Sequence, residues 1–191
     1  MASLQIALNG LALVSAGSSA CCSLSWSVVC SRYEPNGASL TVSGIVERQS
    51  NIYDHLYWLE DYPLANGDVV NIVVLAADGG SEVARVHTHE QLDALRAEVS
   101  RAEAAGEYDA ARAATRVPAR ASCAVGLSTV NGSSLQTASG AVTTVICSGD
   151  WNAEHRPSEW RLRLWSMPVE STVKGAWQSI EGGALVTVGE A

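Results

Sequence analysis

The sequence predicts a mainly β protein of the α+β class, in which two antiparallel β-sandwich or barrel-like modules are joined by one long helix. Three observations predict it. Over most of the chain apolar and polar residues alternate with a period of two, which is typical of strands with one buried face. Turn-forming pairs such as Asn-Gly separate these runs. One stretch, beginning at Thr88, changes to the spacing of a helix.

The domain organisation follows from the position of that helix. We assign residues 1–86 to an N-terminal β module, 87–118 to a helical linker and 119–191 to a C-terminal β module. The alternative is a single mixed domain in which the helix covers one face of a continuous antiparallel sheet. A chain of 191 residues has room for either arrangement, because one core usually takes roughly 100 to 200 residues.

The first module is expected to consist of strands joined by tight turns. Asn9-Gly10 favours a reversal between two short alternating runs, because this dipeptide tolerates positive φ. The run from 69 to 76 is apolar on both faces, as expected of an interior strand covered on both sides. The expected strands, in order, are 4–8, 11–14, 23–32, 38–47, 52–59, 69–76 and 83–86.

The helix is predicted across residues 88–116. Thr88 and Gln91 have the spacing of a capping box, which satisfies two backbone amides at a helix start. Gly106 weakens the middle, and Pro118 prevents continuation. The apolar residues follow the three-four-three spacing of a helical stripe: Leu92, Leu95, Val99 and Ala102.

The second module returns to the strand period. Its expected strands are 122–130, 135–138, 141–148, 159–166 and 184–188. The sequence Val-Val-Cys-Ser at 28–31 recurs as Val-Ile-Cys-Ser at 145–148, so the second module can be a degenerate repeat of the first. Matches this short also arise by chance between Val- and Ser-rich strands, and both interpretations stay open.

Composition and charge narrow the class of partner. The net charge of −8 and the pI near 4.9 oppose binding to nucleic acids and to anionic membranes. A negative surface favours a protein partner with a basic surface, and a homo-oligomer is compatible with the composition. No run reaches the ~18 apolar residues of a membrane span, and no basic residue precedes the first apolar run. We therefore expect a cytoplasmic or virion-associated protein.

The five cysteines show neither a disulfide framework nor the CxxC spacing of a zinc site. Cys30 and Cys147 each lie in an apolar run, where a free cysteine behaves as a small buried hydrophobe. We expect buried thiols.

The chain carries no recognisable catalytic signature, and we expect neither an enzyme nor a cofactor. Three imidazoles in the first module, from His55, His87 and His89, are weak candidates for a metal site. No HExxH motif supports them, and a helix cap at Thr88 would separate the last two side chains.

Tryptophans are the strongest candidates for recognition. Trp26 and Trp160 fit inward-facing strand positions and are expected in the core. Trp151 and Trp177 fall in predicted loops without an inward register. Exposed tryptophans are enriched at protein interfaces, so we predict a partner-binding surface. Its predicted residues are Trp151, Trp177, Tyr57 and Tyr62.

The leading functional hypothesis is a non-catalytic protein-binding protein of the inhibitor, immunity or anti-defence type, which occludes a partner protein. One alternative is a structural component of a larger assembly such as a phage virion, in which edge strands bind neighbours. The other is a small enzyme that depends on a histidine-bound metal.

Overall fold

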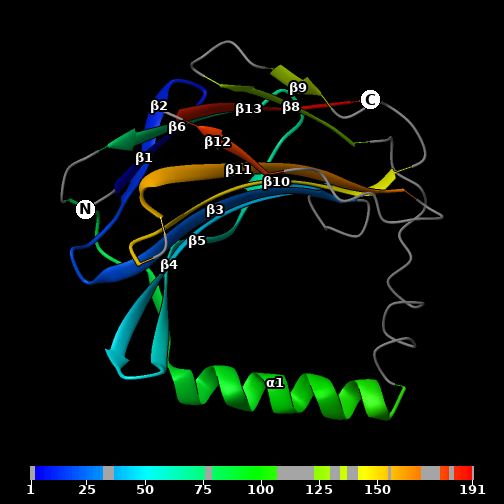
Figure 1. Cartoon of the computed structure of the whole chain (residues 1–191). Helices are drawn as coiled ribbons and strands as arrows, with labels where there is room; N and C mark the ends of the chain where they lie inside the picture. The colour runs from blue at the N-terminus through cyan, green and yellow to red at the C-terminus, as the bar shows by residue number, and fades with distance from the viewer. Residues whose placement is uncertain are drawn as a thin grey trace.

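The computed structural model is a sandwich of two antiparallel sheets with one helix outside it, in the part of the chain that the structure describes (Figure 1). The six-stranded sheet has the order β2 (Leu11–Ala16), β1 (Ser3–Leu8), β6 (Val69–Leu75), β13 (Gly183–Glu190), β8 (Cys123–Thr129) and β9 (Ser134–Gln136). The seven-stranded sheet has the order β12 (Trp177–Ile180), β11 (Arg156–Pro168), β10 (Val142–Asn152), β3 (Cys21–Ser31), β4 (Ala38–Gln49), β5 (Ile52–Leu64) and β7 (Arg85–His87).

The structure describes the backbone of residues 3–31, 37–75, 79–106, 123–129, 134–136, 142–154, 156–168, 177–180 and 183–190. Side chains are described for 3–31, 37–75, 79–106, 146–154, 160 and 161. In this part of the chain no helix has both the length and the apolar character needed to cross a membrane.

The first hairpin forms at the predicted turn. Asn9 and Gly10 both have positive φ, at 52° and 81°, which suits the right-handed twist of the strands they join. The Asn9 side chain also ties this turn to the sheet. Its Oδ1 accepts from the Val69 amide at 2.9 Å, and its Nδ2 donates to Asp68 Oδ1 at 2.7 Å. The turn therefore fixes both β1–β2 and the start of β6.

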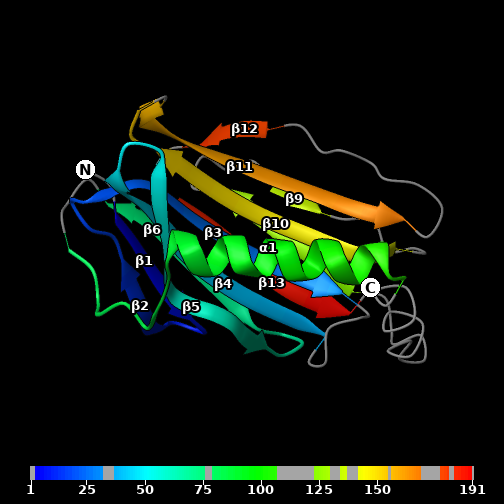
Figure 2. The same ribbon diagram turned by 90° about the horizontal axis from the view of Figure 1, so that it is seen from below.

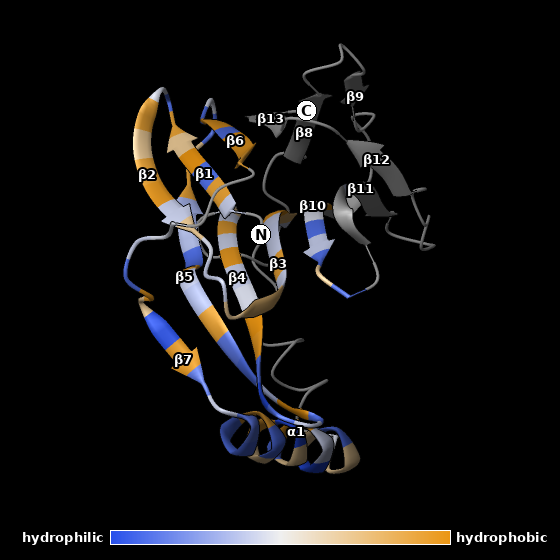
Figure 3. Ribbon diagram, turned by 60° about the vertical axis from the view of Figure 1, so that its left-hand side comes forward, coloured by the Kyte–Doolittle hydropathy of each residue, from blue (hydrophilic) through white to orange (hydrophobic). Residues whose placement is uncertain are grey.

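The core lies between the sheets and follows the alternation of the sequence. From Leu24 to Cys30 on β3 the buried residues are every second one, as the sequence predicts. They pack against buried residues of β1, β4 and β6, and the orange bands of Figure 3 mark these positions on the first-half strands. Trp26 and Trp160 belong to this core, as expected. The mainly β class with two antiparallel sheets is confirmed.

The arrangement as two separate modules is not confirmed, because each sheet takes strands from both halves of the chain. In the seven-stranded sheet β3 pairs with β10, and in the six-stranded sheet β6 pairs with β13. Without these partners β3 and β6 would be edge strands with unpaired backbone groups. Alternation within a strand shows which face is buried, but not which distant strand satisfies its hydrogen bonds.

The helix α1 (His89–Ala104) begins as predicted and ends earlier than predicted. Both bonds of the capping box between Thr88 and Gln91 are present. At the other end Gly106 adopts φ 71°, a left-handed conformation that ends helices. The expected extension over 107–116 lies outside the described residues.

The helix lies along the face of the seven-stranded sheet that points away from the six-stranded sheet. Figures 1 and 2 show it running across this sheet from the side where β7 joins it. No residue of α1 is buried, so the helix does not pack on the sheet as a core helix would.

Candidate functional site: a cavity between helix and sheet

A cavity of about 370 Å³ separates α1 from the seven-stranded sheet, and we call it the helix–sheet cavity. Its volume is in the range of small-ligand and side-chain pockets. Its walls come from α1, from β3, β4 and β5, and from the turn that follows β10. The lining residues are Cys22, Ser23, Ile45, Glu47, Tyr53, His55, His89, Leu92, Arg96, Asn152 and Glu154.

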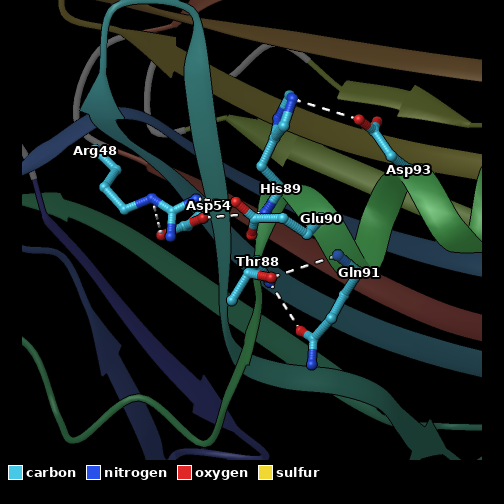
Figure 4. Close-up of polar contacts among 7 residues, drawn as sticks. All are labelled: Arg48, Asp54, Thr88, His89, Glu90, Gln91 and Asp93. Atoms are coloured by element: carbon cyan, nitrogen blue, oxygen red, sulfur yellow. Dashed lines mark hydrogen bonds and ion pairs between the residues drawn. The ribbon is translucent and has the colours of Figure 1, made fainter.

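The cavity exists because α1 is anchored at its first turn. Asp54 on β5 accepts the backbone amide of His89 at 3.0 Å. Arg48, at the end of β4, pairs with Asp54 at 3.7 Å and with Glu90 at 2.6 Å (Figure 4). This network joins the helix start to the β4–β5 hairpin. It sets the height of the helix above the sheet.

Glu90 is the most strongly perturbed carboxyl in this network. Its own backbone amide, followed by the Arg48 and Thr88 side chains, donates a hydrogen bond to the carboxylate, and together these bonds lower its pKa to about 2. A carboxylate here also interacts favourably with the positive end of the helix dipole. Glu90 is therefore charged at any ordinary pH.

One end of the cavity is negative. The charge of Glu47, with a smaller effect of burial, raises the pKa of Tyr53. Burial raises the pKa of the Cys22 thiol, and Glu47 and Glu154 add to that rise. The Cys22 thiol donates to the Ile45 carbonyl at 3.2 Å, so it is held protonated.

His55 and Arg96 also line the cavity. Burial lowers the pKa of His55, and the nearby charges of Arg96 and His87 lower it further. His55 is therefore neutral near pH 7, and the Arg96 guanidinium is paired with Asp93 at 3.1 Å. The lining of the cavity thus combines the acidic Glu47 and Glu154, the basic Arg96 and the apolar Ile45 and Leu92.

The three candidate histidines lie near one another but do not converge on one point. His55 and His87 are paired across β5 and β7, whereas His87 Nε2 lies 3.3 Å from Glu60 Oε1 and His89 Nε2 lies 3.5 Å from Asp93. Among the described residues no three His, Cys, Asp or Glu side chains are placed to hold a metal ion.

Comparison with protein-family models, curated proteins and solved structures finds no match.

The predicted exposed-loop position of Trp151 is wrong. Trp151 lies in β10, paired with Leu24 and Trp160, and only 5% of it is exposed. The β10–β11 hairpin continues beyond Gly149, so the inward alternation continues with it. Trp151 is consequently a core residue, without a free face for a partner in this structure.

The other three predicted partner-binding residues occupy different places. Trp177 lies in β12 and not in a loop, and its side chain lies outside the described residues. Tyr62 is half-buried against the core. Tyr57 is half-buried and meets the His87 ring edge-on, with centroids 5.2 Å apart. Tyr57 and Tyr62 do not line the helix–sheet cavity, and the role of all three residues in binding stays a prediction.

The buried-thiol prediction holds for Cys147 and is wrong for Cys30. Cys147 is buried and free, and burial raises its pKa to about 12, which makes the thiol inert. Cys30 is disulfide-bonded. Spacing along the chain does not reveal such a bond, because strand packing decides which sulfur atoms meet.

Sequence reasoning missed the cavity and the Arg48 network. Arg48 falls between the expected strands 38–47 and 52–59, and nothing in the sequence singles it out. The sequence of α1 did carry a signal for an exposed, anchored helix. Its apolar stripe is narrow, and its first turn holds polar and charged side chains that can form hydrogen bonds and ion pairs with a neighbouring strand.

Proposed function

We propose that the protein is a non-catalytic binding protein that holds a segment of a partner protein in the helix–sheet cavity and so occludes that segment. One observation carries the proposal. The apolar stripe of α1 begins in the cavity at Leu92 and continues outward through Leu95 and Val99, which are 46% and 45% exposed. An anchored helix with an open apolar stripe is a common docking element for a peptide segment.

The charges suggest the chemistry of the partner. A Lys or Arg side chain would face Glu47 and Glu154, while an apolar side chain would fill the space beside Ile45 and Leu92. The net charge of −8 would speed encounter with a basic partner. We therefore propose a partner segment that combines a basic residue with apolar anchors.

The protonated Cys22 thiol and the ion-paired charges beside the cavity support binding over nucleophilic chemistry. A nucleophilic cysteine needs a lowered pKa, whereas that of Cys22 is raised and its thiol donates to a carbonyl. The ionised groups of the α1 anchor are engaged in holding the helix, which is a structural use.

A selection from a display library of random short peptides on the purified full chain tests the proposal. We expect enriched peptides to contain Lys or Arg beside apolar residues. Leu95→Asp with Val99→Asp should weaken their binding by about tenfold or more, the scale of a hot-spot loss. Glu47→Gln with Glu154→Gln should remove the preference for basic residues.

The matched control is Leu11→Asp, because Leu11 is an exposed apolar residue at the start of β2 in the other sheet. Its binding should equal that of the wild type. Equal loss in the control and the α1 variant, or binders that respond to neither, would remove the helix–sheet cavity as the binding site.

A second candidate is a component of a larger assembly. Leu11 is 76% exposed at an edge strand of the six-stranded sheet, where another chain could add a strand. Light scattering of the purified protein separates the two proposals. Large particles that Leu11→Lys disperses would favour assembly, and a concentration-independent monomer would exclude it.

A further inference from the structure

We infer that the chain is an internal duplication, in which two repeats of one six-strand unit meet around a pseudo-twofold axis as the subunits of a homodimer would. The first repeat supplies β1 to β6 and the second supplies β8 to β13. The inference rests on strand order and register, and so it stands apart from the proposed function.

Strand order gives the first argument. In each repeat the first, second and sixth strands enter the six-stranded sheet, and the third to fifth enter the seven-stranded sheet. The six-stranded sheet therefore joins β2-β1-β6 to β13-β8-β9, with equivalent strands at equal distances from the centre. The seven-stranded sheet joins β5-β4-β3 to β10-β11-β12 in the same way, and β7 adds one strand at an edge.

The register at the centre of the seven-stranded sheet gives the second argument. The similar segments 28–31 and 145–148 lie opposite each other in antiparallel strands. Val29 and Ile146, the second residues of the two segments, are paired directly. The first residue of each segment pairs with the third residue of the other. A twofold axis through the Val29–Ile146 pair requires this register, and a shift of one residue would abolish it.

The six-stranded sheet repeats the relation independently. Residues 67–72 read Gly-Asp-Val-Val-Asn-Ile, and residues 183–188 read Gly-Ala-Leu-Val-Thr-Val. Their fourth residues, Val70 and Val186, are paired directly at the centre of the sheet. Equivalent residues of the two repeats thus pair with each other at the centre of each sheet.

The neighbouring strands provide a check. Val70 pairs on its other side with Leu8, and Val186 pairs with Leu127, so pairing alone makes these two leucines equivalent. Extending the match gives Leu-Gln-Ile-Ala-Leu at 4–8 and Cys-Ala-Val-Gly-Leu at 123–127. Apolar residues occupy the first, third and fifth positions of both segments. The two segments are thus alike in sequence pattern as well as in their place in the sheet.

The duplication also explains why the cavity lies on one side. Among the described elements, β7 and α1 have no counterpart in the second repeat, since they form part of the connection between the repeats. A symmetric scaffold with one asymmetric addition has one helix–sheet cavity per chain. If the proposed function is right, partner and chain bind in a ratio of one to one.

Disulfide cross-linking in the full chain tests the axis. Cys21→Ser, Cys22→Ser and Cys147→Ala remove the free thiols. The pairs expected to cross-link under mild oxidation are Val29→Cys with Ile146→Cys, Asn71→Cys with Leu185→Cys, and Val69→Cys with Thr187→Cys. The control pair is Val29→Cys with Ser148→Cys, which is displaced by two residues and too distant to bridge. A cross-link in the control pair in place of the first pair would overturn the inference.

A repeat-replacement chain tests the equivalence itself. In this chain a second copy of residues 4–74 takes the place of residues 123–190. In the control, a shuffled sequence with the composition of residues 4–74 takes the place of residues 123–190. We expect the replacement chain to be monomeric, with a β-type circular dichroism spectrum and cooperative unfolding in urea. Behaviour indistinguishable from that of the shuffled control would count against duplication.

Discussion

Gly149 shows how closely single residues fit in the core. It pairs with Trp26 across β10 and β3, and the indole lies over its backbone. A Cβ atom at Gly149 would lie 2.6 Å from Trp26 Cε2, and closer still to Nε1. Since Trp26 is only 1% exposed, its ring cannot move aside without opening the core.

Gly149→Ala should therefore destabilise the fold by about 1 to 3 kcal/mol, the usual cost of overpacking. Urea unfolding followed by tryptophan fluorescence measures the change. Ser148→Ala, at the neighbouring half-buried position, should stay within about 0.5 kcal/mol of the wild type. If the two variants unfold at the same urea concentration, the Trp26–Gly149 contact is wrong.

Burial separates residues that look alike in the sequence. Leu24 and Leu95 are both leucines in regular apolar patterns, yet Leu24 is fully buried and Leu95 is largely exposed. Leu24→Ala should cost about 2 to 5 kcal/mol, whereas Leu95→Ala should change the stability by about 0.5 kcal/mol or less. Thermal and urea unfolding of both variants check this. A large loss for Leu95→Ala would mean that its stripe is covered within the chain.

At the scale of elements, α1 depends on its first turn more than on packing. Its capping box and the Arg48 network hold the N-terminus, while the rest of the helix buries no residue. An isolated helix of this length is marginal in water. The contacts at the first turn therefore account for its position above the sheet.

The pH dependence of this anchor follows from Glu90. Its folded-state pKa, about 2, lies below the ordinary value of 4.5, so its stabilisation is present above that value. It is lost as pH falls from 4.5 toward 2. The melting temperature of Glu90→Gln should lie below that of the wild type at pH 6, and the difference should shrink as the pH falls below 4.5 and vanish only below about 2. A constant difference across this range would contradict the assigned pairing.

The sequence predicted most of the strands and the start of the helix, but it could not predict where some of the strands end. Strand alternation and the Thr88 capping box identified β1 to β6 and the start of α1, because both signals are local. Trp151 was misplaced because periodicity does not show where a hairpin turns. The cavity could not be predicted, since it depends on the distance at which Arg48 and Asp54 hold the helix.

At the scale of the whole molecule, the sandwich is shared between the two halves of the chain. The pairs β3–β10 and β6–β13 lie at the centres of the two sheets, so neither half completes a sheet alone. These contacts join residues far apart in the chain, which local patterns do not identify. The similarity between the short segments 28–31 and 145–148 was the one sequence feature that indicated a relation between the two halves.

The Cys30 disulfide makes a prediction for the whole chain. The thiols of Cys21, Cys22 and Cys147 form no disulfide, so three of the five cysteines should react with N-ethylmaleimide in denaturant without reductant. All five should react after reduction, and reduction should cost about 2 to 5 kcal/mol of stability. Mass spectrometry counts the adducts, and five adducts before reduction would disprove the bond. Disulfides persist in oxidising compartments, so the cytoplasmic localisation stays a prediction that this bond does not favour.

The sharing of both sheets is tested most directly by cutting the chain between its halves. A protease site inserted between residues 107 and 122 is cleaved in the full chain, and the product is run on size exclusion in the presence of reductant. We expect the two fragments to elute together at the position of the intact chain, because the β3–β10 and β6–β13 ladders still join them. Two separately eluting, folded fragments would contradict the structure and restore the picture of two independent modules.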